Sequence, residues 1–343
     1  MRVLFLSENG EGLGLATHLS SEGHAVNFIV PAGSHIGQGL VGHDAESAPD
    51  FVVYASANLG RDADEYRQSG KRTLGSSRWG ELIESNPEYT DSLIKSIGWS
   101  TNSIDSGINL YITGWFNGRG FLSSYVSLVY RRFMSGGRGP DINFTGVVSN
   151  FWQPTERILE SILKPVSHIL KKVNHRGPIH IHTLIDGDRY CVKELSASLA
   201  HPLSTVLFEN TKASVSDILL RLFNEDSKSI IPIAQWACGV MISIPPYPYQ
   251  AQHNPISIKG IIPDNIKHMW LVDVKRDNEG YSTTGESGKI GYVTARGDSV
   301  HESVRRAYRT INNLSTPDLQ YRDDVGRNIT SLLERLREYQ WIK

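Results

Sequence analysis

The feature that most constrains this fold is an apolar run at the N-terminus that leads into a glycine-rich turn. Val3 to Leu6 is continuously apolar, and it is followed by polar turn residues and three glycines: Glu8, Asn9, Gly10, Gly12 and Gly14. A buried strand, a tight turn and a helix over 13–22 account for this order. Two more apolar runs follow, at 25–30 and 51–54. The order β-α-β-β predicts a parallel sheet of the α/β class at the start of the chain.

The three glycines allow two interpretations. They could receive a phosphate at the N-terminus of the helix. Their spacing does not fit Gly-x-Gly-x-x-Gly, however, and a tight strand-to-helix turn is the simpler explanation. We favour the turn.

Length and composition set the class of protein. The 343 residues exceed what one hydrophobic core usually organises, so two or three domains are expected. A net charge of -1 provides no broad basic surface for a nucleic-acid backbone. Cys191 and Cys238 lie far apart, which excludes a disulfide framework and fits a reducing cytoplasm. The N-terminal apolar run is too short for a signal peptide or a spanning helix, so we expect a soluble cytoplasmic protein without a membrane partner.

The middle of the chain changes to a pattern of hairpins and helices. Helical spacing over 77–97, interrupted at Asn86-Pro87, predicts two short helices. Strands are expected at 108–112, 121–130, 179–185 and 190–193, and a loop is expected at 135–143. Further helices are expected at 155–173 and 214–223. These elements predict an α+β domain.

The last third predicts a smaller α+β unit. Strands are expected near 269–274 and 290–294, and a helix at 299–312. A helix over 328–339 places four apolar side chains on one face, so it should pack on the body or on a second subunit. The predicted domains are an N-terminal parallel-sheet domain (1–76), a central domain (77–235), a C-terminal domain (236–327) and a C-terminal helix (328–343).

Six segments of the chain, taken in order, carry a resemblance to one enzyme family. They are MRVLFLSENGEGLGLATHL, PDFVVYASANLG, TGWFNGRGFL, RRFMSGGRGPDINFTG, YCVKELSASLAHP and ESGKIGYVTARGDSVHESVRRAYRTINNL. Their content and order resemble phosphoribosylamine-glycine ligase, an ATP-grasp enzyme of purine synthesis. The resemblance implies a pre-ATP-grasp N-terminal domain, a reduced ATP-grasp-like central α+β domain and a small C-terminal α+β domain. It also implies amide formation from a carboxylate and a phosphoribosyl or nucleotide amine, with ATP and Mg²⁺ as cofactors.

The resemblance assigns candidate metal and nucleotide positions. The family holds its metal through a Glu-x-Asn pattern, which falls here on Glu194 and Ser196, two alternate residues of one strand. A serine hydroxyl is a weaker Mg²⁺ ligand than an amide oxygen. Thr113, which replaces the family's hinge glutamate, and Trp115 fall at nucleotide-binding positions. The family's Asp before Pro202 is His201 in this chain.

A further departure is the short connection before Leu110. The family carries its lid strands and phosphate-binding lysines there, whereas only about ten residues separate Trp99 from Leu110 in this chain. A two-stranded unit needs strands of about five residues each and a turn. We therefore expect no lid subdomain and weak or absent ATP turnover by the chain alone.

A glycine-rich loop next to several arginines offers a phosphate site. Guanidinium and backbone N–H groups bind phosphate oxygens. The candidates are Arg131, Arg132, Arg138, Gly139, Thr145 and Gly146. We expect the strand that carries Glu194 to face the same cleft as residues 131–143.

More than one interpretation remains for several other polar residues and for the function of the protein. Glu194 could be a metal ligand or a solvated carboxylate at a sheet edge. His180 and His182 share a strand face, but no third metal ligand is evident, so we favour a structural role. The protein could be an amide-forming ligase, completed by a partner subunit or acting on a viral nucleotide or DNA base. It could also be a catalytically reduced phosphoribosyl- or nucleotide-binding subunit, as a homodimer or with another partner.

Overall fold

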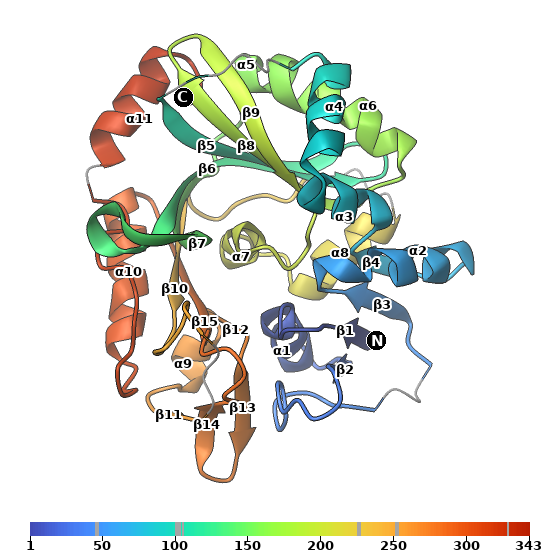
Figure 1. The fold of residues 1–343 in the computed structure, drawn as a ribbon, viewed down its shortest axis with the longest axis vertical. Helices are drawn as coiled ribbons and strands as arrows, with labels where there is room; N and C mark the ends of the chain where they lie inside the picture. Colours follow the sequence, from blue (N-terminus) through green and yellow to red (C-terminus); the bar gives the residue numbers. More distant parts are fainter. Residues whose placement is uncertain (45–47, 100–103, 105, 225–227, 251–253, 328) are drawn as a thin grey trace.

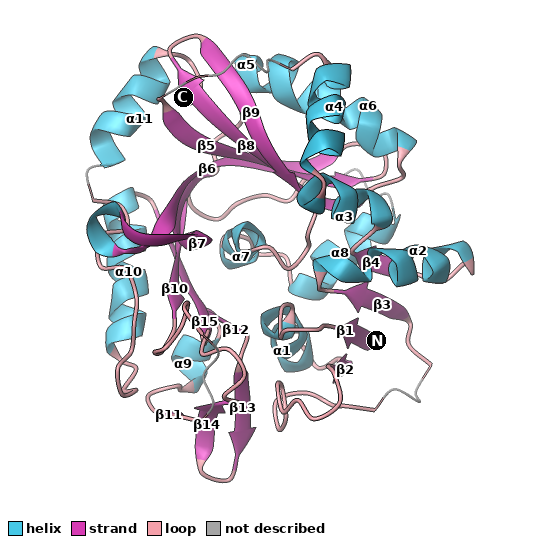
Figure 2. Ribbon diagram, viewed as in Figure 1, coloured by secondary structure: helices cyan, strands magenta, loops and turns pink. Residues whose placement is uncertain are grey.

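The fold comes from a computed structural model that describes residues 1–44, 48–99, 104, 106–224, 228–250, 254–327 and 329–343. These residues form three sheets and the helices that cover them (Figure 1). The N-terminal sheet and the C-terminal strands lie side by side, the central strands lie above both, and helix α7 (Pro202–Glu209) runs between them (Figure 2). Among the described residues, every helix is too short or too polar to cross a membrane.

The N-terminal sheet is parallel throughout, as the β-α-β-β order predicts. Its strand order is β2-β1-β3-β4. The strands are β1 (Arg2–Leu6), β2 (Ala25–Ile29), β3 (Phe51–Tyr54) and β4 (Thr73–Gly75). Helix α1 (Leu13–Ser21) joins β1 to β2, and helix α2 (Gly60–Gln68) precedes β4. Helix α1 begins after Gly12, whose φ of 88° lies in the left-handed region that favours glycine.

The second sheet is antiparallel and has eight strands in the order β12-β15-β10-β7-β6-β5-β8-β9. They are β5 (Ile108–Asn117), β6 (Phe121–Met134), β7 (Arg138–Asn150), β8 (Arg176–Asp186), β9 (Arg189–Ser196), β10 (Trp236–Ile242), β12 (Met269–Leu271) and β15 (Gly291–Gly297). Because β10 pairs with both β7 and β15, this sheet continues across the boundary expected between residues 235 and 236. The domain boundaries stay predictions. A third sheet contains β11 (Ser257–Ile258), β14 (Gly280–Thr283) and β13 (Val274–Asp277).

Helices cover the sheets near the positions that periodicity predicts. They are α3 (Arg78–Ser85), α4 (Pro87–Ile97), α5 (Glu156–Ile158), α6 (Lys164–Lys172), α8 (Val215–Asn224), α9 (Pro263–Ile266), α10 (Val300–Asn312) and α11 (Ile329–Glu338). A π-helical turn, Leu159–Leu163, joins α5 to α6. Asn86 separates α3 from α4 because its side chain caps α4, accepting a hydrogen bond from Tyr89 N at 3.0 Å, with Pro87 in the first turn.

Two stretches differ from the sequence prediction. Most of the segment expected as a loop, 135–143, belongs to β7, which starts at Arg138 after a short turn at Ser135–Gly137. The first part of β7 pairs with Arg132 and Met134 of β6, a register that local sequence does not reveal. Strand β6 also continues beyond its expected end at Tyr130 to Met134. Residues 100–103 and 105 of the connection expected to replace the lid lie outside the described residues.

Candidate functional site

The N-terminal sheet and the C-terminal segments are held together by backbone contacts. Gly37 N donates to Val274 O at 2.9 Å. Gly14 packs so closely on Trp270 that a Cβ at this glycine would lie 2.8 Å from the Trp270 Cα. These contacts position the N-terminal end of α1, which lines a small cavity together with the N-terminal end of α7.

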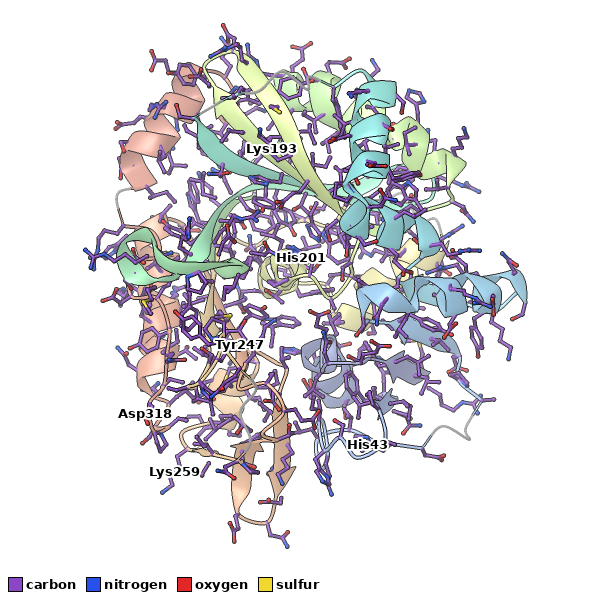
Figure 3. All side chains as sticks on the ribbon, in the orientation of Figure 1. His43, Lys193, His201, Tyr247, Lys259 and Asp318 are labelled. Carbon is purple, nitrogen blue, oxygen red and sulfur yellow. The ribbon has the colours of Figure 1, made fainter. Side chains whose placement is uncertain are left out.

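The larger cavity, of about 510 Å³, lies where β9 faces α3 and α4. Figure 3 shows Lys193 on β9 and His201 near the centre of the molecule, at the start of α7. The residues that matter for its chemistry are Glu84, Tyr111, Asn143, Glu194, Ser196 and His201. Both predicted metal ligands therefore line one cavity.

Arg131 crosses from β6 to this cavity wall and binds four acceptor groups. Its Nη1 donates to Glu194 Oε2 and to Tyr111 Oη, each at 2.8 Å. Its Nη2 donates to Asn143 Oδ1 at 2.8 Å and to Glu194 Oε1 at 3.3 Å, and its Nε donates to Asp141 Oδ2 at 3.0 Å. The expected convergence of the Glu194 strand with residues 131–143 is confirmed. All five guanidinium donors are engaged, so a phosphate at Arg131 would have to displace one of these acceptors.

Glu194 is held in its ionised form. His182 Nδ1 lies 3.4 Å from Glu194 Oε2, and the His182 ring stacks on Tyr111 with centroids 4.4 Å apart. The His182 imidazole, together with the Arg131 guanidinium, lowers the pKa of Glu194 to about 2, although partial burial acts in the opposite direction. The carboxylate is therefore charged throughout the physiological range.

The predicted metal pair does not fit Mg²⁺ in this structure. Ser196 donates its hydroxyl to Glu84 Oε1 at 2.7 Å, and Glu194 is neutralised by Arg131. Burial raises the pKa of Glu84. In the part of the chain that the structure describes, no group of three or more His, Cys, Asp or Glu side chains is arranged to hold a metal ion. The expected ligand role of Glu194 and Ser196 has no support from this geometry.

His201 separates the larger cavity from a smaller one of about 30 Å³. Its Nδ1 accepts a hydrogen bond from Leu203 N at 3.1 Å, which assigns the ring proton to Nε2. Its ring stacks on His180 with centroids 4.4 Å apart, and Thr113 Oγ1 lies 3.0 Å from His180 Nδ1. Burial lowers the pKa of His201 to about 3. The ring is therefore a neutral donor beside both cavities.

The smaller cavity is lined by both Lys289 and Glu11. Lys289 Nζ lies 5.1 Å from the Tyr292 ring centroid, and no carboxylate of the described residues lies within 4.0 Å of it. Burial alone would lower the pKa of Lys289, but Tyr292 and Glu11 outweigh burial and raise it, so the ammonium stays charged. The N-terminal ends of α1 and α7 complete the wall. A partly buried cation beside two helix N-termini favours an anion.

The predicted nucleotide-binding residues lie inside the central sheet. Thr113 and Trp115 both have 0% of their surface exposed, and Trp115 packs edge-on against Phe208. A nucleotide would reach neither side chain without a rearrangement of the sheet. Their assignment stays a prediction.

The remaining residues of the predicted phosphate loop lie on the β6–β7 hairpin. Arg132 donates to Gly139 O at 3.0 Å, and Arg138 is exposed at the start of β7. Thr145 is buried and donates to Tyr130 O at 2.7 Å. At Gly146 a Cβ would lie 2.4 Å from Val325 Cγ2. Thr145 and Gly146 thus have packing roles, and none of these residues lines the two cavities.

The sheets and the cleft between them define an ATP-grasp-like fold. Phosphoribosylamine-glycine ligase from Thermotoga maritima matches with a TM-score of 0.73 and 15% identity, over 94% of this chain and 100% of that chain. L-amino acid ligase from Bacillus licheniformis matches with a TM-score of 0.59 and 14% identity, over 92% of this chain and 98% of that chain. At these identities the similarity shows the fold alone.

In sequence, the chain is similar to phosphoribosylamine-glycine ligase. The protein of that name from Clostridium acetobutylicum is 24% identical over 232 residues, which cover 65% of this chain and 54% of that protein. The chain therefore spans about half the length of this relative. No protein-family model matches the chain. The resemblance found from the segments is confirmed, whereas the relative's activity is a proposal for this chain.

Sequence reasoning missed Lys289, Tyr111 and Asn143. Lys289 offered a signal, because it is a single lysine in the apolar and glycine-rich stretch SGKIGYV. The contacts of Arg131 with Tyr111 and Glu194 join residues 20 and 63 positions apart. No local pattern could reveal them.

Proposed function

We propose that this protein binds a phosphorylated small molecule of the phosphoribosyl or nucleotide class in the cleft around His201. We further propose that it is ligase-like in fold and does not carry out ATP-driven amide formation as an isolated chain. The observation that carries the proposal is Lys289, a partly buried ammonium beside the N-terminal ends of α1 and α7. The similarity to phosphoribosylamine-glycine ligase supports the ligand class.

The two cavities suit a ligand with an anionic head and a larger polar body. The smaller cavity, about 30 Å³, holds roughly two water molecules and so suits a small anionic group. The body would extend past His201 into the cavity of about 510 Å³. There the Nε2–H of His201 would donate to a ligand oxygen, and its low pKa keeps this donor unchanged at physiological pH.

The geometry around Glu194 supports the absence of amide formation by the chain alone. Phosphoryl transfer needs cations that are free to bind the transferring oxygens. The Arg131 guanidinium is engaged by protein acceptors, and Ser196 is directed to Glu84. Neither group is available for that chemistry in this arrangement.

A second candidate is an amide-forming ligase whose missing parts come from a partner subunit. The size of the larger cavity favours it, because that space leaves room for a second substrate beside the first. Its lining holds both an acidic group, Glu84, and a basic one, Lys193. ADP release that appears only when another protein is added would favour this candidate.

Calorimetry with ribose 5-phosphate, ADP and ATP tests the proposal, together with an ADP-release assay that contains glycine. We expect ribose 5-phosphate to bind, Lys289→Met to weaken its binding at least about tenfold, and no glycine-dependent ADP release. The control is Lys259→Met, which removes the same charge from an exposed lysine at the outer edge of the C-terminal region (Figure 3).

Two outcomes would contradict the proposal. Unchanged affinity in Lys289→Met, with loss in Arg132→Ala, would place the anion at the β6–β7 hairpin instead. Glycine-dependent ADP release by the chain alone would show that it is a complete ligase.

A further inference from the structure

Arg131 lies in a cage of oxygen atoms. Its acceptors are two carboxylates, Asp141 and Glu194, the amide oxygen of Asn143 and the phenol oxygen of Tyr111, at 2.8–3.3 Å. They come from strands β5, β7 and β9, which the sheet holds in fixed register with β6. Carboxylate and amide oxygens are the ligands that hard divalent cations prefer.

We infer that the Arg131 guanidinium is a built-in cation that fills a divalent-metal position of this sheet, so that removing its side chain opens a metal site. The inference explains why Glu194 and Ser196 do not fit Mg²⁺. It does not depend on the phosphorylated ligand proposed above. The charge that Glu194 would offer to a metal is already neutralised by a side chain of the same chain.

Geometry explains why the guanidinium holds this position against a free ion. Arginine stays charged at all physiological pH values, and its planar fork satisfies acceptors at five N–H groups. Its side chain is 19% exposed, so the charge lies largely within the protein. A metal ion would have to displace a covalently attached cation and leave that cation without partners.

Removal of the guanidinium leaves its acceptor oxygens free to bind a metal ion. Asp141 and Glu194 both accept from Arg131, and without it these two carboxylates, 42% and 53% exposed, lose their shared counter-charge. Two unpaired carboxylates attract a counter-ion, and the Asn143 and Tyr111 oxygens remain to complete the coordination. The vacated volume is that of a long side chain, which leaves room for an ion and its waters.

The test is a Mn²⁺ titration followed by electron paramagnetic resonance. We expect Arg131→Ala to gain one Mn²⁺ site at least about tenfold tighter than any site in the wild type, and Arg131→Ala/Glu194→Gln to lose it. Arg132→Ala is the matched control, because it removes the neighbouring arginine without opening the cage. It should gain no site.

Thermal unfolding provides a second measurement in case Arg131→Ala is unstable. Mn²⁺ should raise the melting temperature of Arg131→Ala and leave that of the wild type unchanged, since a ligand stabilises only the state that binds it. The inference is overturned if Mn²⁺ neither binds nor stabilises Arg131→Ala. It is equally overturned if the wild type binds Mn²⁺ through Glu194 and loses that binding in Glu194→Gln.

Discussion

At the scale of single residues, Glu209 carries the connection between α7 and the C-terminal strands. It is 4% exposed and accepts hydrogen bonds from Arg296 Nη1 at 3.0 Å, Thr294 Oγ1 at 3.0 Å and His268 Nδ1 at 2.9 Å. A buried carboxylate is tolerated only when its partners compensate the lost hydration. Nothing in the local sequence distinguishes this glutamate from a solvated one, because its partners lie 59 to 87 positions away.

We expect Glu209→Leu to lower the free energy of unfolding by about 2 to 4 kcal/mol, because Arg296, Thr294 and His268 all lose the carboxylate that accepts their hydrogen bonds. The lower part of that range is favoured by the partial exposure of Arg296, at 35%. Urea unfolding at neutral pH measures the change. Glu160→Gln, which breaks an exposed pair with Lys164, is the control and should leave the midpoint nearly unchanged. Equal effects of the two variants would refute the role assigned to Glu209.

At the scale of elements, the sequence predicted the parts whose signals are local. The parallel N-terminal sheet follows from apolar runs separated by turn residues, and the break at Asn86 follows from capping chemistry. The start of β7 and the continuity of the sheet through β10 depend on pairing between distant strands. Such register is set by tertiary contacts, and no local pattern determines it.

Gly146 is another position whose role depends on a distant residue. The sequence predicted a glycine of a phosphate site, whereas the structure shows a glycine in close contact with Val325. A Cβ at this position of β7 would lie 2.4 Å from Val325 Cγ2, in the segment after α10. We expect Gly146→Ala to destabilise the fold by about 1 to 3 kcal/mol through overpacking. The double variant Gly146→Ala/Val325→Ala should recover more than half of the loss, as measured by urea unfolding. If the changes in unfolding free energy of the two single variants simply add in the double variant, the contact with Val325 is not what destabilises Gly146→Ala.

At the scale of the whole molecule, several buried histidines make stability depend on pH. His175 and His180 are buried, at 7% and 1% exposure, and His201 lies between the two cavities. Burial lowers the pKa of His175 to about 4 and that of His201 to about 3, and it lowers the pKa of His180 well below 6.5. These side chains come from the connection before β8, from β8 and from the start of α7. Protonation of any of them places a charge in a buried site and therefore opposes folding.

The sign of the pH dependence follows from proton binding. Between pH 6.5 and about 4 the unfolded chain binds protons at these histidines and the folded chain does not, so stability is fully present above pH 6.5 and decreases as the pH falls. By pH 5, a histidine with a folded pKa of about 4 contributes a loss of about 2 kcal/mol. Urea unfolding at pH 7.5 and pH 5 should show this decrease. His175→Gln should reduce the difference between the two pH values by about that amount, whereas His301→Gln, at an exposed position of α10, should not. A difference that is the same in the wild type and in His175→Gln would show that His175 is protonated equally in the folded and unfolded chains.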